Sequence, residues 1–338
     1  MGELRLDPMT ARWVIISNEK DFGPEGYDIE SPSIDGSGAC PFCPGNERLT
    51  PPEVDADRPS ASGADTPGWV TRTVPNKFPA LKNEPDLERS GIGVFDMMNG
   101  IGEHEVIIED TDHNKQLADL SIEQIKRIIY VYKRRSIELG RDERFKYVLI
   151  FKNYGLAAGA SLEHSHTQLI SLPIVPKRVM EELECAQRYY DYKERCVFCD
   201  IARQELDYRH REICENDDFV AFCPFASRSP FEISIIPRRH QAYFTNISDG
   251  QIENFARILK EILMRVRQAL HNPPYNFIIH TTPLNGNNSS NDFHVYYHWH
   301  VEVMPKLSKI AGFEWGSGFY INSTSPETAS RYLREAVI

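Results

Sequence analysis

Apolar residues recur with two different spacings along the chain, and these spacings predict where helices and strands form. Between Ser121 and Leu139, apolar side chains recur every three to four residues, as they do on one face of a helix. Ser121 is suited to cap this helix, because its hydroxyl can accept a hydrogen bond from the first turn. Further helices are predicted over residues 176–195 and 248–270.

Shorter apolar or alternating segments predict β-strands. The segment 4–17 indicates a hairpin that turns at Asp7-Pro8-Met9-Thr10. We expect a loop over residues 82–102. Further strands are predicted at residues 69–74, 104–109, 146–152, 218–224, 231–237, 275–280 and 294–305.

The features of the first half recur in the same order in the second half. Each half contains a Cys-x-x-Cys pair, a strand, a histidine, a long helix, another strand, a small-residue loop and a His-x-His segment. Repeated order of this kind is typical of duplication, so we expect an α+β protein of two related units, residues 1–180 and 181–338. The corresponding residues are Cys40, Cys43, His113, His164 and Gln168 in the first half and Cys196, Cys199, His240, His298 and Glu302 in the second.

The two Cys-x-x-Cys pairs predict two structural zinc sites per chain. Zinc prefers thiolate and imidazole ligands, and four protein ligands leave no position for water. For the first site His104 is an alternative to His113, and for the second His300 is an alternative to His298. A redox pair is the competing interpretation, but such a pair normally begins a helix, and a loop is expected after each pair here. The predicted ligand sets are Cys40, Cys43, His113 and His164, and Cys196, Cys199, His240 and His298.

The segment 151–173 carries the candidate chemistry. His164, His166 and Gln168 alternate, so a strand would place them on one face. Neutral imidazole is already a nucleophile near neutral pH, so we predict that His166 attacks a substrate while His164 binds metal. The small-residue loop 157–161 offers backbone N–H groups to phosphate oxygens, and the Gln168 amide can donate to a phosphoryl oxygen. The competing interpretation is that His166 is a hydrogen-bonded histidine of the core.

Charge and composition narrow the range of partners. The 338 residues carry a formal net charge of −11 and no long basic run, so duplex nucleic acid is not an expected partner. The first 20 residues contain no apolar stretch long enough for a signal peptide or a membrane span, and we expect a cytoplasmic protein without a membrane partner. Seven cysteines, an odd number, do not favour a disulfide framework.

The motif HSHTQ at residues 164–168 resembles the His-x-His-x-Gln signature of the galactose-1-phosphate uridylyltransferase family, a branch of the histidine-triad (HIT) superfamily. The resemblance extends along nearly the whole chain. It includes the start at residues 5–16, the segments CPFC, PNKFPAL, VIIEDTDH and FKNYG, and the closing HWHVEVMP. The segment GFEWGSGFYIN at 312–322 is similar to a related branch, the ADP-glucose phosphorylases.

This resemblance implies two HIT-like repeats, each a mostly antiparallel half-barrel sheet with flanking helices, in a homodimer. It implies transfer of uridylyl from UDP-glucose to a hexose 1-phosphate such as galactose 1-phosphate, through a covalent nucleotidyl-His166 intermediate. Some members of the family hold iron at the second metal site through a different ligand set. Carried over by position, the catalytic residues are His166 and Gln168, and the substrate-binding residues are Asn76, Lys77, Asn153, Gly159, Ser161 and Lys309.

Two other functions remain open at this point. An ADP-glucose phosphorylase would use the same nucleophile to transfer an adenylyl group to inorganic phosphate. A zinc-stabilised nucleotide-binding protein would have no transfer activity. If the chain is an enzyme, we expect only the first repeat to carry chemistry, because Glu302 takes the place of Gln168 in the second and a carboxylate repels phosphate.

Overall fold

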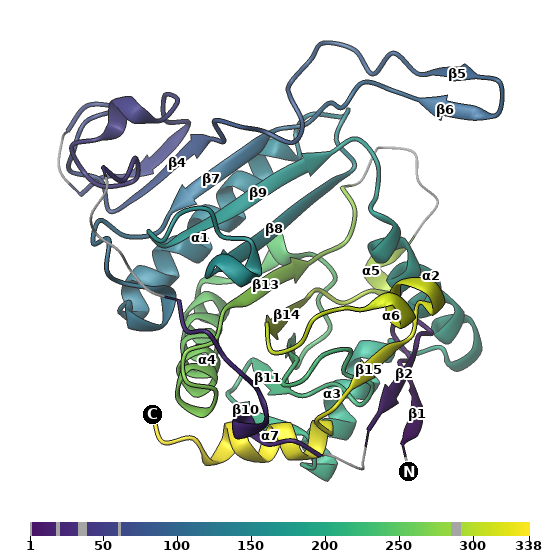
Figure 1. Cartoon of the computed structure of the whole chain (residues 1–338). Coiled ribbons are helices and arrows are strands. Elements are labelled where there is room, and N and C mark those ends of the chain that lie inside the picture. Colours follow the sequence, from purple (N-terminus) through teal and green to yellow (C-terminus); the bar gives the residue numbers. More distant parts are fainter. Residues whose placement is uncertain (1, 18–20, 33–38, 60–61, 285–291) are drawn as a thin grey trace.

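The computed structural model describes residues 2–17, 21–32, 39–59, 62–284 and 292–338, and a ten-stranded antiparallel sheet forms its centre (Figure 1). The strands of the first half are β3 (Asp55–Asp57), β4 (Thr71–Pro75), β7 (His104–Ile108), β8 (Tyr147–Tyr154) and β9 (His166–Leu172). Those of the second half are β10 (Glu212–Glu215), β11 (Phe219–Phe222), β12 (Ile233–Pro237), β13 (Tyr275–His280) and β14 (His300–Pro305).

The order of these strands is the same in both halves when counted outward from the middle. β8 pairs with β13 at the centre, and the sheet runs β10-β11-β12-β14-β13-β8-β9-β7-β4-β3. Each strand of the first half therefore has a counterpart in the second: β8 with β13, β9 with β14, β7 with β12, β4 with β11 and β3 with β10. This arrangement supports the predicted duplication.

Two long helices cover one face of the sheet. α1 (Ile122–Leu139) and α4 (Asp249–Ala269) pack together, and their apolar faces join sheet residues in the largest hydrophobic core. Ser121 caps α1 by accepting a hydrogen bond from Gln124 N, and Ser248 caps α4 in the same way. Both helices therefore form at the residues where apolar spacing predicts them.

The other face is covered mainly over the second half. α2 (Lys177–Lys193) and α3 (Val197–Tyr208) pack there against inward-facing residues of β11 and β12, including Val220, Phe222 and Ile236. On the first half the corresponding side chains of β8 and β9, such as Phe151 and Gln168, are only partly buried. This difference leaves the ends of β8 and β9 accessible.

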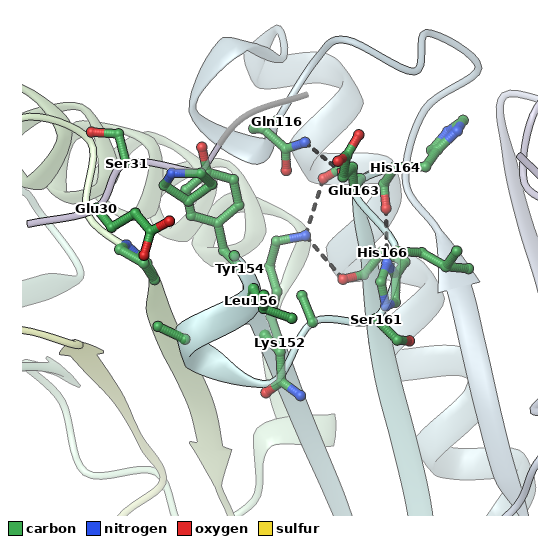
Figure 2. Close-up of a pocket in the computed structure, with 18 residues that line it drawn as sticks. Glu30, Ser31, Gln116, Lys152, Tyr154, Leu156, Ser161, Glu163, His164 and His166 are labelled. Atoms are coloured by element: carbon green, nitrogen blue, oxygen red, sulfur yellow. Dashed lines mark hydrogen bonds between the residues drawn. The ribbon is translucent and has the colours of Figure 1, made fainter. Parts of the chain in front are cut away.

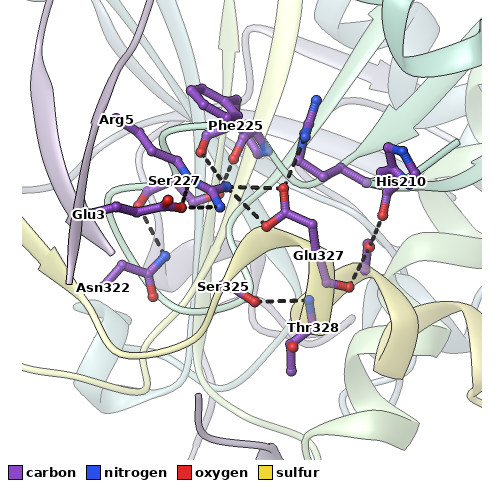
Figure 3. A network of polar contacts seen from close by, with 12 residues as sticks. Glu3, Arg5, His210, Phe225, Ser227, Asn322, Ser325, Glu327 and Thr328 are labelled. Atoms are coloured by element: carbon purple, nitrogen blue, oxygen red, sulfur yellow. Dashed lines mark hydrogen bonds and ion pairs between the residues drawn. The ribbon is translucent and has the colours of Figure 1, made fainter. Parts of the chain in front are cut away.

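The two ends of the chain lie together on the second half. β1 (Glu3–Leu6) and β2 (Trp13–Ile16) form the predicted hairpin, and β2 pairs in parallel with β15 (Tyr320–Asn322). Figure 3 shows how ion pairs hold this region to α7 (Pro326–Glu335). Arg5 Nη1 lies 3.0 Å from the Glu327 carboxylate, and Arg211 Nη1 donates to the same carboxylate at 2.9 Å.

A two-stranded arm projects from the first half, formed by β5 (Ser90–Ile92) and β6 (Phe95–Met97) (Figure 1). The prediction of a loop over 82–102 was wrong at these residues. The arm packs on no core, so it lacks the apolar alternation by which buried strands are recognised. Its exposed side chains are nevertheless apolar and include Ile92, Val94, Phe95 and Met97.

Two further predictions need correction near the second Cys-x-x-Cys pair and the second His-x-His segment. Cys196 is the N-cap of α3, so a helix rather than a loop follows this pair. The segment before His300 is not a strand, because Phe293–Tyr296 form a short helix, α5. β3, β10, β15, α7 and the short helix α6 (Gly312–Ser317) were not predicted. Within the described residues, every helix is too short or too polar to span a membrane.

Candidate active site and metal centres

His166 is the first residue of β9, and its ring is oriented by the chain just before the strand. His166 Nδ1 lies 2.8 Å from the carbonyl oxygen of His164. Since a carbonyl only accepts, Nδ1 carries the proton and Nε2 is left with a free lone pair. Burial lowers the pKa of His166 to about 4, with a smaller contribution from the charge of Lys152. The imidazole is therefore neutral near pH 7, the form that attacks an electrophile.

A cavity of about 380 Å³ opens beside His166 (Figure 2). It is lined by residues 155–157 and 160–166 of the loop, by Lys152 to Tyr154 and by Glu30, Ser31, Pro32, Gln116 and Pro274. The loop turns sharply at Gly155 (φ 81°) and Gly159 (φ 88°), conformations that side chains other than glycine rarely adopt. The predicted residues Asn153 and Ser161 both line this cavity.

Gln168 follows His166 on the same face of β9, and its amide is oriented by a residue of β7. His104 Nδ1 accepts from Ala80 N at 3.2 Å, so His104 Nε2 carries the proton and donates to Gln168 Oε1 at 2.8 Å. Asn76 Nδ2 lies 3.5 Å from the same oxygen. With its oxygen so occupied, Gln168 keeps its NH₂ group to donate to a ligand. His104, an alternative zinc ligand in the sequence, therefore has a different role.

On the opposite face of the sheet, a buried ion pair lies directly behind His166. Lys152 Nζ uses all three of its protons: it donates to Glu109 Oε2 at 2.6 Å, to Ser165 Oγ at 3.0 Å and to the His166 carbonyl at 2.9 Å. Figure 2 shows Lys152 pointing toward the His164–His166 segment. Burial alone would raise the pKa of Glu109, but Lys152 and hydroxyl donors outweigh it and keep that pKa below its usual value.

The first predicted metal centre is assembled at the edge of this site. Ligand atoms of Cys40, Cys43, His113 and His164 all lie within 4.8 Å of one another. The His164 and His113 rings point Nδ1 toward Cys43 Sγ, at 3.6 and 3.5 Å. His164 Nε2 donates to the Asp110 carbonyl at 2.8 Å, which leaves Nδ1 deprotonated as a ligand must be. Two sulfurs and two imidazoles fit a tetrahedral metal ion.

The second predicted centre has the same composition. Cys196, Cys199, His240 and His298 place their ligand atoms within 4.8 Å of one another. Cys199 Sγ lies 3.4 Å from His240 Nδ1 and 3.5 Å from His298 Nδ1. Because a helix begins at Cys196, the expected loop after the pair no longer counts against a redox function. The two imidazoles that converge on Cys199 are nevertheless the arrangement of a metal site. His300 is not part of this group.

His300 instead lies in a third buried cluster, on the second-half strand that corresponds to β9. Its ring stacks on His280 at 4.8 Å between centroids. Glu302 is bound by Arg178 Nη2 at 2.6 Å and by Arg228 Nη2 at 2.8 Å, and Glu182 contacts His280 Nδ1 at 3.1 Å. Burial alone would lower the pKa of His280, but Glu182 and Glu302 outweigh it and raise the pKa to about 9. Ion pairs thus occupy the space in which a substrate would have to bind.

Of the six predicted substrate residues, only Asn153 and Ser161 are among those that line the cavity, and the predicted catalytic residue Gln168 does not line it either. Lys77 and Lys309 are exposed and do not line it within this chain. Sequence reasoning missed Lys152, Glu109 and the contact of His104 with Gln168. A signal for Lys152 was available, because a lone cation in the apolar strand Tyr147–Tyr154 needs a buried partner.

Comparisons with known proteins identify the family of the chain. Residues 3–176 match the model of the galactose-1-phosphate uridyl transferase N-terminal domain, and residues 97–337 match a domain of unknown function, DUF4921. The chain is 36% identical to ADP-glucose phosphorylase of Arabidopsis thaliana, over 98% of this chain and 92% of that protein. It is 30% identical to galactose-1-phosphate uridylyltransferase of Thermotoga maritima, over 100% of this chain and 99% of that protein. The crystal structure of the Arabidopsis ADP-glucose phosphorylase with bound ADP-glucose superimposes with a TM-score of 0.85 at 34% identity, covering 100% of this chain and 99% of that one.

Proposed function

The chain belongs to the galactose-1-phosphate uridylyltransferase family of nucleotidyl-transferring enzymes, and we propose that it transfers the nucleotidyl group of a nucleoside diphosphate sugar by way of His166. The observation that carries this proposal is the state of His166. Its Nδ1 lies 2.8 Å from the His164 carbonyl, so that Nε2 is free, and the ring borders a cavity beside a loop of small residues. Burial lowers the pKa of His166 to about 4, which favours the neutral ring.

The proposed reaction has two displacements at the α-phosphorus. In the first, His166 Nε2 forms a P–N bond while the P–O bond to the β-phosphate breaks, and sugar 1-phosphate leaves with the electron pair. In the second, a phosphate oxygen of the acceptor attacks and the P–N bond breaks. Gln168 donates its amide N–H to a non-bridging oxygen in both steps, which stabilises the charge that develops there.

The substrate-binding residues are assigned by family position together with their placement. Asn153, Gly159 and Ser161 would contact phosphates, since they surround the turn beside His166. Asn76 and Lys77 would contact the nucleoside. Lys309 is exposed and would reach the site of a second subunit.

Two donors fit this chemistry. UDP-glucose, with galactose 1-phosphate as acceptor, is the pairing named by the family. ADP-glucose, with inorganic phosphate as acceptor, is favoured by the higher identity to the Arabidopsis enzyme, 36% against 30% for the Thermotoga enzyme. The nucleophile and the covalent intermediate are the same for both.

The test is to incubate the protein with UDP-glucose or ADP-glucose labelled at the α-phosphate and to measure acid-labile label on the protein. We expect one equivalent of label per chain from one donor, with matching release of glucose 1-phosphate, and none in a His166→Gly variant. Addition of galactose 1-phosphate or of inorganic phosphate should then discharge the label and identify the acceptor. Absence of label from both donors would favour a nucleotide-binding protein without transfer activity.

We infer that zinc occupies both Cys₂His₂ centres and has a structural role, since four protein ligands leave no coordination position for substrate. Metal analysis should find close to two zinc ions per chain. Iron in a substantial fraction would contradict the second ligand set, and a third equivalent of metal would point to the cluster around His280.

We also propose that the chain forms a homodimer. The arm β5–β6 exposes Ile92, Val94, Phe95 and Met97, and the segment after β14 exposes Phe313 and Trp315. Apolar side chains grouped in this way are typical of an interface. Light scattering should report twice the mass of one chain, and a Val94→Asp/Phe95→Asp variant should shift the protein toward the monomer. A monomeric wild-type protein would contradict the proposal.

A further inference from the structure

Behind His166 the structure holds charges that the fold itself does not require. The second half of the sheet shows this, because it has different residues at the same strand positions. In β8 and β9 Phe151 pairs with Gln168, and in β13 and β14 Ile278 pairs with Glu302. Counting one residue along each strand, Lys152 therefore corresponds to Ile279.

The same register identifies the other counterparts. Val106 pairs with Gln168 and Ser234 pairs with Glu302, so Glu109, three residues beyond Val106, corresponds to Pro237. Along β9 and β14, Ser165 and Thr167 correspond to Trp299 and Val301. Each polar residue behind His166 is thus matched by an apolar residue behind His300.

A buried ion pair is a poor way to gain stability. Removing a carboxylate and an ammonium group from water is costly, and apolar residues of similar volume are often as stable or more so. Lys152 and Glu109 are at most 1% exposed, and the second half is built with isoleucine and proline at these positions. A reason for the pair must lie in what is peculiar to the first half, which is His166.

The contacts of the pair converge on the residues around the nucleophile. Lys152 donates to Ser165 Oγ and to the His166 carbonyl. Glu109 accepts from Ser165 Oγ and Thr167 Oγ1, and its backbone N–H donates to the Ser165 carbonyl at 3.1 Å. Three consecutive residues are therefore fixed to one pair of side chains on the face of the sheet opposite Gln168.

We propose that Lys152 and Glu109 are positioning residues for nucleotidyl transfer, which hold the 165–167 backbone so that His166 Nε2 points at the α-phosphorus. The inference rests on the proposed function. During attack the P–N bond forms at Nε2, the P–O bond to the leaving sugar phosphate breaks, and the Nδ1 proton stays on its bond to the His164 carbonyl. The pair exchanges no proton, because all three Lys152 protons are already donated to Glu109, Ser165 and the His166 carbonyl.

The test removes both charges at once in a Lys152→Met/Glu109→Gln variant, which leaves no unpaired buried charge. Single-turnover release of glucose 1-phosphate is measured over a range of donor concentrations. We expect the maximal rate to fall about 100-fold, since a misplaced nucleophile loses that much, and the half-saturating donor concentration to change less than about threefold. A residue needed only for folding would lower the melting temperature and leave the rate of the folded protein unchanged.

Thr167→Val provides a second variant that is safe for the fold, because valine occupies the corresponding position 301 of the second half. It removes one hydroxyl that donates to Glu109, and we expect a fall of about fivefold in the same rate, as for the loss of one hydrogen bond. Should the double variant not fold, this variant decides the question alone.

The matched control is the buried ion pair of Arg211 with Glu205, which is 2.7 Å long and lies in the second half. Arg211→Met/Glu205→Gln should lower the melting temperature and keep the single-turnover rate within about twofold of wild type, because distant sites act independently. A control as slow as the Lys152/Glu109 variant, or wild-type rates in both that variant and Thr167→Val, would overturn the inference. A wild-type protein that takes no label from either donor would instead refute the proposed function, and this inference with it.

Discussion

His166 and His300 occupy corresponding positions at the start of β9 and β14, and their surroundings are opposite in polarity on both faces of the sheet. His166 borders an open cavity on one side and has the Lys152–Glu109 ion pair behind it. His300 has Ile279 behind it, and its front is filled by His280, Glu182 and Glu302. In both rings, Nδ1 faces the carbonyl oxygen of the histidine two residues earlier in the chain. The distance is 2.8 Å for His166 and 3.2 Å for His300.

This difference shows that the His-x-His motif alone does not make a reacting site. What distinguishes the halves is where charge is placed. In the second half, ion pairs with Arg178 and Arg228 fill the front and exclude a ligand. In the first half, the ion pair lies at the back and the front keeps neutral hydrogen-bond donors.

The largest difference between the two halves is expected when the two histidines are substituted in turn. His166→Asn is expected to reduce single-turnover release of glucose 1-phosphate by at least about 10⁴-fold, because the nucleophile is lost. His300→Asn should keep the rate within about twofold. If the His300 variant loses activity while its melting temperature stays at the wild-type value, the second half takes part in the chemistry.

The next position along each strand tests the role of charge. Gln168→Glu gives the first half the residue of the second, and should slow nucleotidyl transfer by about 100- to 1,000-fold, as for the loss of a donor to a charged transition state. Because glutamate and glutamine are isosteric, this change should not disturb the packing. Binding of free nucleotide is measured to check that the variant is folded. The reverse change, Glu302→Gln, should leave the rate unchanged and lower the melting temperature, since Arg178 and Arg228 each lose one carboxylate partner. A normal rate for Gln168→Glu would contradict the proposed role of the amide.

We expect the two metal centres to differ in their effect on the transfer rate, because they lie at different distances from the nucleophile. Cys40→Ser is expected to lose one zinc ion and to slow transfer about 100-fold, because His164 supplies the carbonyl that orients His166. Cys196→Ser should also lose one zinc ion, with a lower melting temperature but a rate within about threefold of wild type. Metal content, melting temperature and single-turnover rate are measured together. Equal effects of both variants on the rate would show that the two centres are not distinct in role.

The smallest expected effect is a pH dependence of stability that belongs to the second half. Because the pKa of His280 is raised to about 9 in the folded protein, its contribution to stability is fully present below the unfolded pKa of about 6.5 and is lost as pH rises through about 9. The melting temperature should therefore fall between pH 7 and 10, by about 2–4 °C more in wild type than in His280→Asn, which carries the residue of position 153. An identical pH profile for the two proteins would show that His280 is not ionised.

The sequence predicts much of this fold because its main signals are local. The long helices α1 and α4 combine an apolar face with a capping serine, and both formed where expected. The repeated order of motifs predicts the four residues of each proposed metal centre, and the fold brings each set together. The arm β5–β6 was missed because its side chains face solvent on a segment without a core partner.

The contacts that shape the site were beyond the sequence for a different reason. Lys152 and Glu109 are 43 positions apart, and only the pairing of β8 with β9 and of β9 with β7 brings them to one point. The contact of His104 with Gln168 likewise depends on register across two strands. A single sequence contains the residue types but not the register that determines which of them meet.

The pairing of β2 with β15 has a consequence for how the chain is made. The hairpin 3–16 leaves the ribosome well before its partner strand and before Glu327, which is 322 positions beyond Arg5. At ordinary translation speeds the hairpin waits roughly 15–65 s for them. During that interval its apolar residues Val14 and Ile16, which are fully buried in the folded protein, are exposed to solvent and to other proteins in the cell. Newly made chains should therefore depend on chaperones until β15 and α7 have been synthesised.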